Sequence, residues 1–342
     1  MPPVQKLKKM ESDILKMQKR QKMQGRISGS LQKSFMMQIR FPVRVIRVRL
    51  RRTVTGAEKR RIRKSSGRKR GNKMKIGNKE FDTAKHTYIM GILNVTPDSF
   101  SDGGKWNGYD AAMRHAEELL EGGTDILDIG GESTRPGHQQ ITSEEEITRT
   151  APVIEAVKKN FDVPVSIDTY KSDVAEAALQ AGADLVNDIW GFQYDEKMAG
   201  LVKKYDAACC LMHNKNEAVY KNFLKDMYAE LQKCVDTAKA AGIGDDRIML
   251  DPGVGFGKTY EMNLDVMKHL ELFNGLGYPM LLGTSRKSMI GLTLDLPVTE
   301  REEGTLVTTV MAVQSHYGFV RVHDAEKNRR AIKMTEVILA RE

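Results

Sequence analysis

The chain has 342 residues, and its 54 Lys and Arg residues against 45 Asp and Glu give a formal net charge of +9. The excess lies entirely in residues 1–73, which hold 24 basic and three acidic residues, so that residues 74–342 carry a net charge of −12. This asymmetry argues against a uniformly basic nucleic-acid-binding domain and restricts any such function to the tail. No apolar run approaches the roughly 18 residues of a membrane span. We therefore expect a cytoplasmic protein with no membrane partner.

The segment 1–73 admits three interpretations. Its basic clusters at 44–52 and 60–64 could contact the phosphates of a nucleic acid or of an anionic membrane. An Arg-rich, acid-poor leader is also typical of an organellar transit peptide. We predict a poorly ordered extension, because its few apolar residues cannot offset the entropy lost on ordering. The folded domain is then expected to span 74–342.

The folded part is predicted to begin with a small hairpin at 74–85, in which Gly77 and Asn78 form the turn. From residue 86 onward, short β-branched apolar runs alternate with amphipathic stretches, a pattern typical of parallel strands joined by crossover helices. The expected strands are 86–95, 125–130, 163–169, 185–189, 207–213, 247–250, 280–284 and 319–323. The expected helices are about 110–121, 144–160, 171–181, 196–205, 217–241, 263–273, 301–317 and 325–340. Eight such units predict an α/β protein, a (β/α)8 TIM barrel, with the hairpin plugging its lower end.

Polar residues follow every predicted strand, at the end of the barrel where active sites lie. A single one of them is usually a helix cap or a turn residue. Their presence at all eight ends instead indicates a ligand site. The residues and segments are Asn94, 96–104, Asp128, 132–137, Asp168, Asn187, 212–214, Asp251, 285–288, Arg321 and His323.

These residues suit a ligand with two chemically different ends. Carboxylates, an amide and an ammonium group suit a planar heterocycle whose amino and ring N–H groups lie beside a carbonyl oxygen. Such groups are supplied by Asp168, Asn187, Asp251 and Lys287. A second set could hold an anion, for which a diphosphate is the natural candidate. It comprises Asn94, Arg321 and His323.

Other site types find little support in the sequence. The segment 251–258 is rich in glycine but lacks the spacing of a phosphate-binding loop, so we interpret it as a tight turn that presents Asp251 and Phe256. The seven His and three Cys residues show no zinc-site spacing. A Mg²⁺ ion bridging a diphosphate is compatible with the sequence, because that ion needs few protein ligands.

Five segments together resemble the dihydropteroate synthases of folate biosynthesis. They are 91–104, 128–137, 251–258, 285–288 and 321–324. The resemblance runs from about residue 74 to the C-terminus and does not extend to the first 73 residues. It implies a transferase that joins 6-hydroxymethyl-7,8-dihydropterin diphosphate to 4-aminobenzoate, with Mg²⁺ as cofactor, a homodimeric assembly and sensitivity to sulfonamides.

The resemblance also implies a role for each matching residue. The pterin ring would be bound by Asp168, Asn187, Met212, Asp251 and Lys287. The diphosphate would be held by Asn94, Arg321 and His323, with Mg²⁺ beside Asn94. The 4-aminobenzoate pocket would be framed by Thr134, Arg135, Pro136, Phe256 and Ser288. The residues closest to the chemistry would be Asp102, Lys287, Arg321 and His323. This chain departs from the family at His213 and Asn214, because many relatives carry a second methionine after the histidine.

The implied chemistry needs no strong base, because an aniline nitrogen is already neutral at pH 7. We therefore expect dissociative C–O cleavage, in which diphosphate leaves before the amine is captured. One alternative is a pterin-binding methyltransferase of the methyltetrahydrofolate:corrinoid type, which would not need the diphosphate residues. Another is nucleic-acid binding through the basic tail on an inactive barrel.

Overall fold

The computed structural model describes residues 73–95, 105–132 and 140–341. The predictions made for the tail, Asp102, Thr134, Arg135 and Pro136 fall outside these residues. Within the described part of the chain, no helix is long and apolar enough to cross a membrane.

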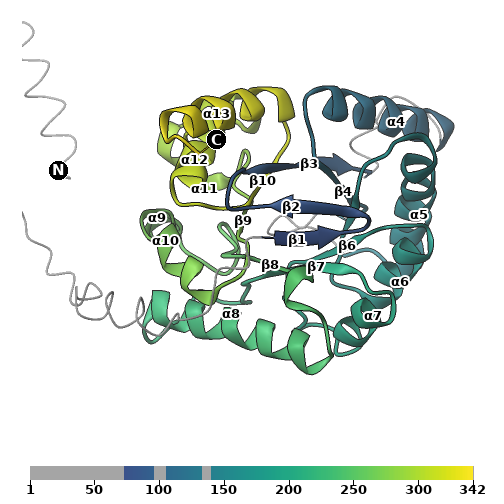
Figure 1. The fold of residues 1–342 in the computed structure, drawn as a ribbon, viewed down its shortest axis with the longest axis horizontal. Coiled ribbons are helices and arrows are strands. Elements are labelled where there is room, and N and C mark those ends of the chain that lie inside the picture. The colour runs from purple at the N-terminus through teal and green to yellow at the C-terminus, as the bar shows by residue number, and fades with distance from the viewer. Residues whose placement is uncertain (1–72, 96–104, 133–139, 342) are drawn as a thin grey trace, which may run out of the picture. The chain divides into compact units, whose positions relative to one another are not determined.

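Eight parallel strands form one sheet in the described residues, and helices surround it (Figure 1). The order of the strands is β8-β7-β6-β5-β4-β3-β10-β9, and a parallel bridge between Leu250 and Met280 joins the two ends. The strands are β3 (Tyr88–Asn94), β4 (Ile126–Gly130), β5 (Val165–Asp168), β6 (Leu185–Asp188), β7 (Ala208–Met212), β8 (Ile248–Asp251), β9 (Leu281–Leu282) and β10 (Phe319–Val322). The predicted (β/α)8 barrel is confirmed.

The helices follow the strands in alternation, as expected. They are α4 (Lys105–Glu121), α5 (Ser143–Asn160), α6 (Ser172–Gln180), α7 (Met198–Lys204), α8 (Phe223–Ala240), α9 (Tyr260–Lys268), α10 (Leu270–Phe273), α11 (Ser288–Leu294), α12 (Glu302–Gln314) and α13 (Ala325–Ile338). Short 3₁₀ turns cover Asp245–Arg247, Asn274–Leu276 and Val298–Glu300.

Several helical predictions differ from the structure. Helix α4 begins at Lys105 rather than at about 110, and α12 ends at Gln314 rather than at 317. Helix α8 begins at Phe223 rather than at 217. The Asp226 carboxylate accepts hydrogen bonds from the backbone N–H groups of Lys221 and Asn222, which caps the N-terminus of the helix at this point. The single helix expected at 263–273 is divided into α9 and α10 at His269. Helix α11 was not predicted, and it ends at Asp295 in the left-handed conformation.

Alternation along the strands divides the apolar residues into two layers. One set faces the surrounding helices, for example Leu93, Ile129 and Val320. The other faces the barrel interior at its lower end and includes Met90 and Phe319. The interior is therefore filled by side chains at the end opposite the polar strand ends.

The predicted hairpin is present as antiparallel strands β1 (Lys73–Ile76) and β2 (Lys79–Asp82). Gly77 takes a positive φ of 58° in the turn, a conformation that glycine adopts without strain. Met74, Ile76 and Phe81 are buried against the lower interior residues of the barrel. The hairpin therefore closes this end of the barrel, as predicted.

Phe81→Ala should lower the free energy of unfolding by about 3 to 5 kcal/mol, the usual cost of emptying a buried aromatic site. The Phe81 ring is buried and makes edge contacts with Tyr88 and Phe319, at centroid separations of 4.9 and 5.7 Å. Urea unfolding would measure the loss, with Phe81→Leu as a control that fills most of the volume. Equal stability of the two variants would contradict a packed plug.

Candidate active site

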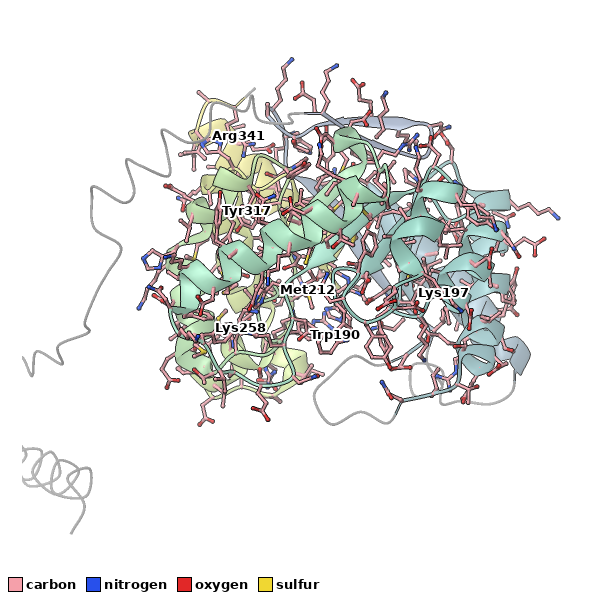
Figure 2. The ribbon with its side chains drawn as sticks, turned by 90° about the horizontal axis from the view of Figure 1, so that it is seen from below. Trp190, Lys197, Met212, Lys258, Tyr317 and Arg341 are labelled. Atoms are coloured by element: carbon pink, nitrogen blue, oxygen red, sulfur yellow. The ribbon has the colours of Figure 1, made fainter. Side chains whose placement is uncertain are left out.

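Polar interior side chains form a layer at the carboxyl ends of the strands. Several lie two residues beyond an apolar interior residue of the same strand, such as Ile92 before Asn94, Leu185 before Asn187 and Met249 before Asp251, so alternation directs them to the same side. Asp168 is in register with Asn187, and Met212 with Asp251. The predicted interior residues of this layer are Asn94, Asp168, Asn187, Met212, Asp251, Arg321 and His323, and the topology of the sheet brings them to one end of the barrel. Met212 packs with Trp190 there, and both are labelled in Figure 2.

Arg321 joins two buried carboxylates from neighbouring parts of the barrel. Its Nε donates to Asp128 Oδ2 at 2.5 Å, and one terminal nitrogen donates to Asp168 Oδ2 at 2.5 Å. Asn187 Nδ2 donates to the same Asp128 oxygen at 3.3 Å. The sequence placed Asp128 at a strand end without giving it a role. Its interior position in β4, two residues after Ile126, was the available signal.

Burial and charge oppose each other in this cluster. Burial raises the pKa of Asp168 to about 7, although the Arg321 guanidinium lowers it. Burial lowers the pKa of Arg321, but the carboxylates of Asp128 and Asp168 outweigh this effect and raise that pKa above its ordinary value. Arg321 therefore stays protonated, and Asp168 titrates near neutral pH.

The cluster retains unused acceptors. Asp128 Oδ1, Asp168 Oδ1 and Ser166 Oγ are buried and have no hydrogen-bond partner among the described residues. Leaving a buried acceptor unsatisfied costs free energy, so its presence calls for an explanation. A ligand whose N–H groups reach these carboxylate oxygens would satisfy them.

Lys287 lies across the loop that follows β8. Its Nζ donates to the Val254 carbonyl oxygen and lies 4.4 Å from the centroid of the Phe256 ring. Gly255 has a φ of +90°, and a Cβ there would lie 3.0 Å from Lys287 Cδ, so the close approach favours glycine. Burial lowers the pKa of Lys287 to about 8, while Asp251 acts in the opposite direction. The cation that is hydrogen-bonded to Asp168 is Arg321.

A second partly buried lysine, Lys258, was not predicted. Its Nζ donates to the carbonyl oxygens of Gly253 and Phe256 at 2.8 and 2.9 Å and lies 3.0 Å from His213 Nδ1. His213 Nε2 in turn lies 2.7 Å from Glu230 Oε2. Lys258 therefore ties its own loop to the end of β7, which agrees with the interpretation of 251–258 as a turn rather than a phosphate loop.

Burial sets the protonation of this pair. It lowers the pKa of Lys258 to about 7, against the raising effect of Asp251. It also lowers the pKa of His213 to about 4, and Lys258 adds to this shift. At neutral pH, His213 is therefore an uncharged acceptor for the Lys258 amine.

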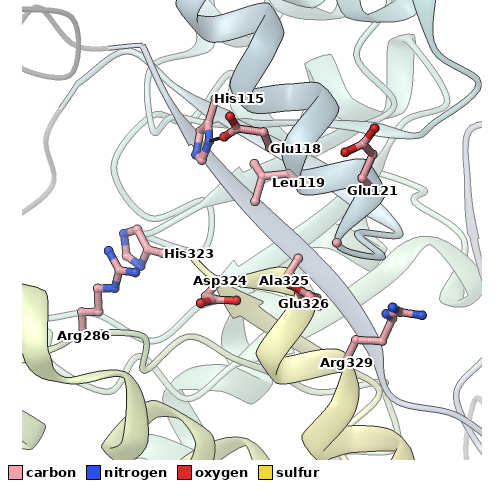
Figure 3. A pocket seen from close by; sticks show the side chains of 11 residues that line it. His115, Glu118, Leu119, Glu121, Arg286, His323, Asp324, Ala325, Glu326 and Arg329 are labelled. Carbon is pink, nitrogen blue, oxygen red and sulfur yellow. Dashed lines mark hydrogen bonds and ion pairs between the residues drawn. The ribbon is translucent and has the colours of Figure 1, made fainter.

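His323 lies at the outer edge of the polar layer. Its Nδ1 is 2.9 Å from Ser285 Oγ. His323 and Arg286 line a cavity of about 550 Å³ that also reaches His115 on α4 and Arg329 on α13 (Figure 3). Arg286 adopts a positive φ of 57°, an uncommon conformation for a residue with a side chain.

A small apolar cluster completes the described part of the site. Tyr170, Ile189 and Met212 are buried together, and Trp190 and Phe256 pack against them. Ser288, the other described residue predicted for the aminobenzoate pocket, begins α11 directly after Lys287 and is exposed.

Comparisons with known proteins agree with this arrangement. Residues 90–323 match the family model of the pterin binding enzymes. The dihydropteroate synthase of Clostridium beijerinckii is 58% identical over 269 residues, which are 78% of this chain and 100% of that protein. The dihydropteroate synthase of Bacillus subtilis is 51% identical over 253 residues, which are 74% of this chain and 89% of that protein. The chain belongs to the dihydropteroate synthase family.

Solved structures of dihydropteroate synthases share the fold. One from Clostridium difficile, determined in the presence of pteroic acid, has a TM-score of 0.74 and 49% identity, and covers 75% of this chain and 98% of its own. One from Xanthomonas albilineans with 4-aminobenzoic acid has a TM-score of 0.75 and 36% identity. The match covers 79% of this chain and 98% of that chain. The protein is thus a transferase of folate biosynthesis, which decides against the methyltransferase alternative.

Arg321→Met should lower the free energy of unfolding by about 3 to 5 kcal/mol near pH 8, because it leaves two buried carboxylates without their cation. Loss of Arg321 raises the pKa of Asp168 further above that of an unfolded aspartate. Between the pKa of an unfolded aspartate and the raised pKa of Asp168, the folded variant binds a proton that the unfolded chain does not bind. The stability of the variant therefore falls as pH rises through this interval. Urea unfolding should therefore show a smaller deficit near pH 5 than near pH 8.

Arg330→Met is the matched control for this variant, because it removes an exposed ion pair with Glu326. It should change stability little at either pH. A deficit of Arg321→Met that is the same at both pH values would argue against a coupled buried cluster.

Proposed function

We propose that this chain condenses 6-hydroxymethyl-7,8-dihydropterin diphosphate with 4-aminobenzoate to give 7,8-dihydropteroate and diphosphate. The observation that carries the proposal is the Arg321 cluster, whose buried carboxylate oxygens face the end of the barrel where active sites lie. The relatives solved with pteroic acid and with 4-aminobenzoic acid support the identity of the product and of one substrate.

The pterin ring is assigned to the strand residues of the polar layer. Its amino and ring N–H groups would donate to the carboxylates of Asp168 and Asp251, and Asn187 and Lys287 would donate to its oxygen and ring nitrogen. The unused Asp168 Oδ1 supports this assignment, since a pterin N–H would satisfy it. Met212, within the apolar cluster, would pack against the ring face.

The diphosphate is assigned to Asn94, Arg321 and His323. The two hydrogen bonds from Arg321 to Asp128 and Asp168 fix the plane of its guanidinium and orient the remaining N–H groups. The contact with Ser285 orients the His323 ring at the mouth of the barrel. Cationic groups held in place before the reaction stabilise a departing anion without further reorganisation.

Asn94 also suits a magnesium ion bound together with the diphosphate. Asn94 is partly buried at the end of β3. A Cβ placed on Gly130 would lie 3.8 Å from Asn94 Oδ1 and 3.7 Å from Asp168 Oδ2. These two oxygens therefore lie on the same side of the barrel mouth. Among the described residues, no three His, Cys, Asp or Glu side chains are grouped to hold an ion. Asn94 would thus be one ligand among diphosphate oxygens and waters. A bound Mg²⁺ supplies charge neutralisation of the leaving group.

The reaction we propose is dissociative. The C–O bond of the pterin methylene breaks with its electron pair passing to the diphosphate, and the electron-rich dihydropterin carries the resulting cation. The aniline nitrogen then forms the C–N bond and loses one proton. Arg321 and His323 hold the leaving anion, Lys287 and the carboxylates hold the ring, and Asp102 is the residue we assign to stabilising the cation. Thr134, Arg135, Pro136, Phe256 and Ser288 are assigned to the aminobenzoate.

We also propose a homodimer in the cytoplasm. Exposed large apolar side chains gather on α11, α12 and α13, which pack in sequence. They include Leu292, Val307, Met334, Val337 and Ile338. A second copy of the chain would cover this face. Since the Yersinia pestis relative was solved as a sulfonamide complex, we further propose that sulfonamides compete with aminobenzoate here.

The full chain should release diphosphate when both dihydropterin diphosphate and 4-aminobenzoate are present, and dihydropteroate should form in equal amount. A coupled diphosphate assay with chromatography of the pteroate product measures both. Omission of Mg²⁺ should reduce the rate, because the leaving charge is less neutralised. Release of diphosphate in the presence of both substrates without formation of dihydropteroate would contradict the proposed reaction.

Lys287→Met should reduce kcat/KM for dihydropterin diphosphate about a hundredfold, or roughly 3 kcal/mol, because buried carboxylates lose a nearby cation. Since the pKa of Lys287 is lowered to about 8, activity of the unsubstituted enzyme should fall as pH rises through that value. Lys268→Met, which changes an exposed lysine of α9, is the control. Near-normal kcat/KM for Lys287→Met would reject its pterin role.

A further inference from the structure

The loop after β8 is tied to the end of β7 by Lys258, a residue that has no part in the reaction proposed above. Its Nζ donates to the carbonyl oxygens of Gly253 and Phe256 at 2.8 and 2.9 Å and lies 3.0 Å from His213 Nδ1. The His213 carbonyl oxygen is a more distant acceptor, at 3.4 Å. An ammonium group has three N–H donors, so the three nearest acceptors use all of them.

The partners of the His213 ring determine which of its nitrogens carries the proton. Its Nε2 lies 2.7 Å from Glu230 Oε2. Burial raises the pKa of Glu230, but hydrogen bonds from Lys215 and His213 outweigh this effect and lower it, so Glu230 is a carboxylate. A carboxylate only accepts hydrogen bonds, so Nε2 carries the proton and Nδ1 is the acceptor. The contact between Lys258 and His213 is therefore a hydrogen bond donated by the lysine.

Two consecutive loop residues connect Lys258 with residues assigned to the pterin. The carbonyl oxygen of Gly253 accepts from Lys258, and the backbone N–H of Gly253 donates to Asp251 Oδ1 at 2.7 Å. The next carbonyl oxygen, that of Val254, accepts from Lys287 Nζ. Gly253 and Val254 thus lie between Lys258 on one side and Asp251 and Lys287 on the other.

The loop residues 252–258 belong to no helix or strand, so side chains must supply the contacts that fix their backbone. Asn263 Oδ1 accepts from one loop N–H, and the Tyr220 hydroxyl donates to one loop carbonyl oxygen, both at 2.7 Å. These two contacts hold the part of the loop farther along the chain from β8. The part that directly follows Asp251 is held by Lys258.

Stability alone is a weak reason for an ammonium group at this position. Removing a charge from water is costly, and an apolar side chain of similar volume often stabilises a fold as much. An apolar side chain cannot supply three donors whose directions are fixed by three acceptors on two loops. The position of Lys258 is therefore better explained by the geometry that it imposes on the loop.

We infer that Lys258 is a positioning residue for the pterin ring, which acts by holding Asp251 and Lys287 in place. It acts through the two loop residues that contact them, Gly253 and Val254. Its own N–H groups are taken by acceptors of the protein, so its effect on the ligand is indirect. The inference rests on the proposed function, because that proposal assigns Asp251 and Lys287 to the pterin.

The test uses the full chain with Lys258→Met, which keeps much of the side-chain volume but removes its charge and donors. Calorimetry without aminobenzoate measures the dissociation constant of dihydropterin diphosphate. We expect this constant to rise about tenfold or more at pH 6, because displaced contacts cost binding in this range. Lys158→Met is the matched control, since it removes a partly buried ion pair with Asp184, at 2.8 Å. It should change the constant less than about twofold.

The dependence on pH separates positioning from a general loss of stability. Burial lowers the pKa of Lys258 to about 7, with Asp251 and Glu230 favouring the charged form and Lys287 opposing it. Above this pH the amine has only two donors, so the unsubstituted chain itself loses one of the three contacts. The ratio of the two dissociation constants, variant to unsubstituted, should therefore be smaller at pH 8 than at pH 6. Lys258 also keeps the pKa of His213 low, so protonation of His213 in the variant acts in the same direction.

Two further variants complete the test. In a Lys287→Met background, Lys258→Met should raise the constant by a smaller factor than in the unsubstituted chain, because part of its effect passes through Lys287. His213→Leu does not depend on the folding of Lys258→Met. It removes one of the three acceptors and should raise the constant by a smaller factor than Lys258→Met does.

The inference is overturned by any of four results. They are an unchanged dissociation constant in His213→Leu, a Lys258→Met effect that is the same at pH 6 and pH 8, full additivity of Lys258→Met with Lys287→Met, and an equal effect of Lys158→Met. Failure of the unsubstituted chain to bind dihydropterin diphosphate would instead overturn the proposed function.

Discussion

The site depends on one constraint, which is that carboxylates shielded from solvent in the barrel must be neutralised by groups within the barrel. Arg321 meets this requirement for Asp128 and Asp168 with two hydrogen bonds of 2.5 Å. Its plane and position are thereby set by residues from two other strands. A residue held in this way can present its remaining N–H groups to an anion without losing side-chain entropy on binding.

The same constraint explains why the carboxylates suit a pterin. One guanidinium does not satisfy every oxygen of the two aspartates, and burial leaves the pKa of Asp168 near 7. A ligand with several adjacent N–H donors supplies what the protein lacks. Binding of such a ligand and ionisation of Asp168 are therefore linked, because the donors favour the charged carboxylate. The net charge of the domain has little bearing on this, since the charges placed at the strand ends set the local potential that a ligand meets.

Much of the fold and part of the site were predictable from sequence, for local reasons. The alternation of apolar runs and amphipathic stretches located all eight strands, and the Gly77 turn located the hairpin. The extra helix α11 escaped because it is only seven residues long and follows a two-residue strand. The pairing of Arg321 with Asp128 escaped because 193 residues separate them, and spacing carries no information about such contacts. The roles of Asp102, Thr134, Arg135 and Pro136 are still predictions from the family resemblance.

Two lysines missed by the sequence reasoning show a common arrangement of the barrel mouth. Lys258 joins the end of β7 to the loop after β8, through His213 and the Gly253 and Phe256 carbonyls. Lys171 joins the end of β4 to the residues that precede α5. In both cases a lysine nitrogen connects two neighbouring strand ends, those of β7 and β8 for Lys258 and those of β4 and β5 for Lys171. Strands are rigid enough to orient their own side chains, whereas residues on loops need such added contacts to hold their geometry. Lysines in such positions therefore hold the bases of loops in a fixed place relative to the rigid strands of the barrel.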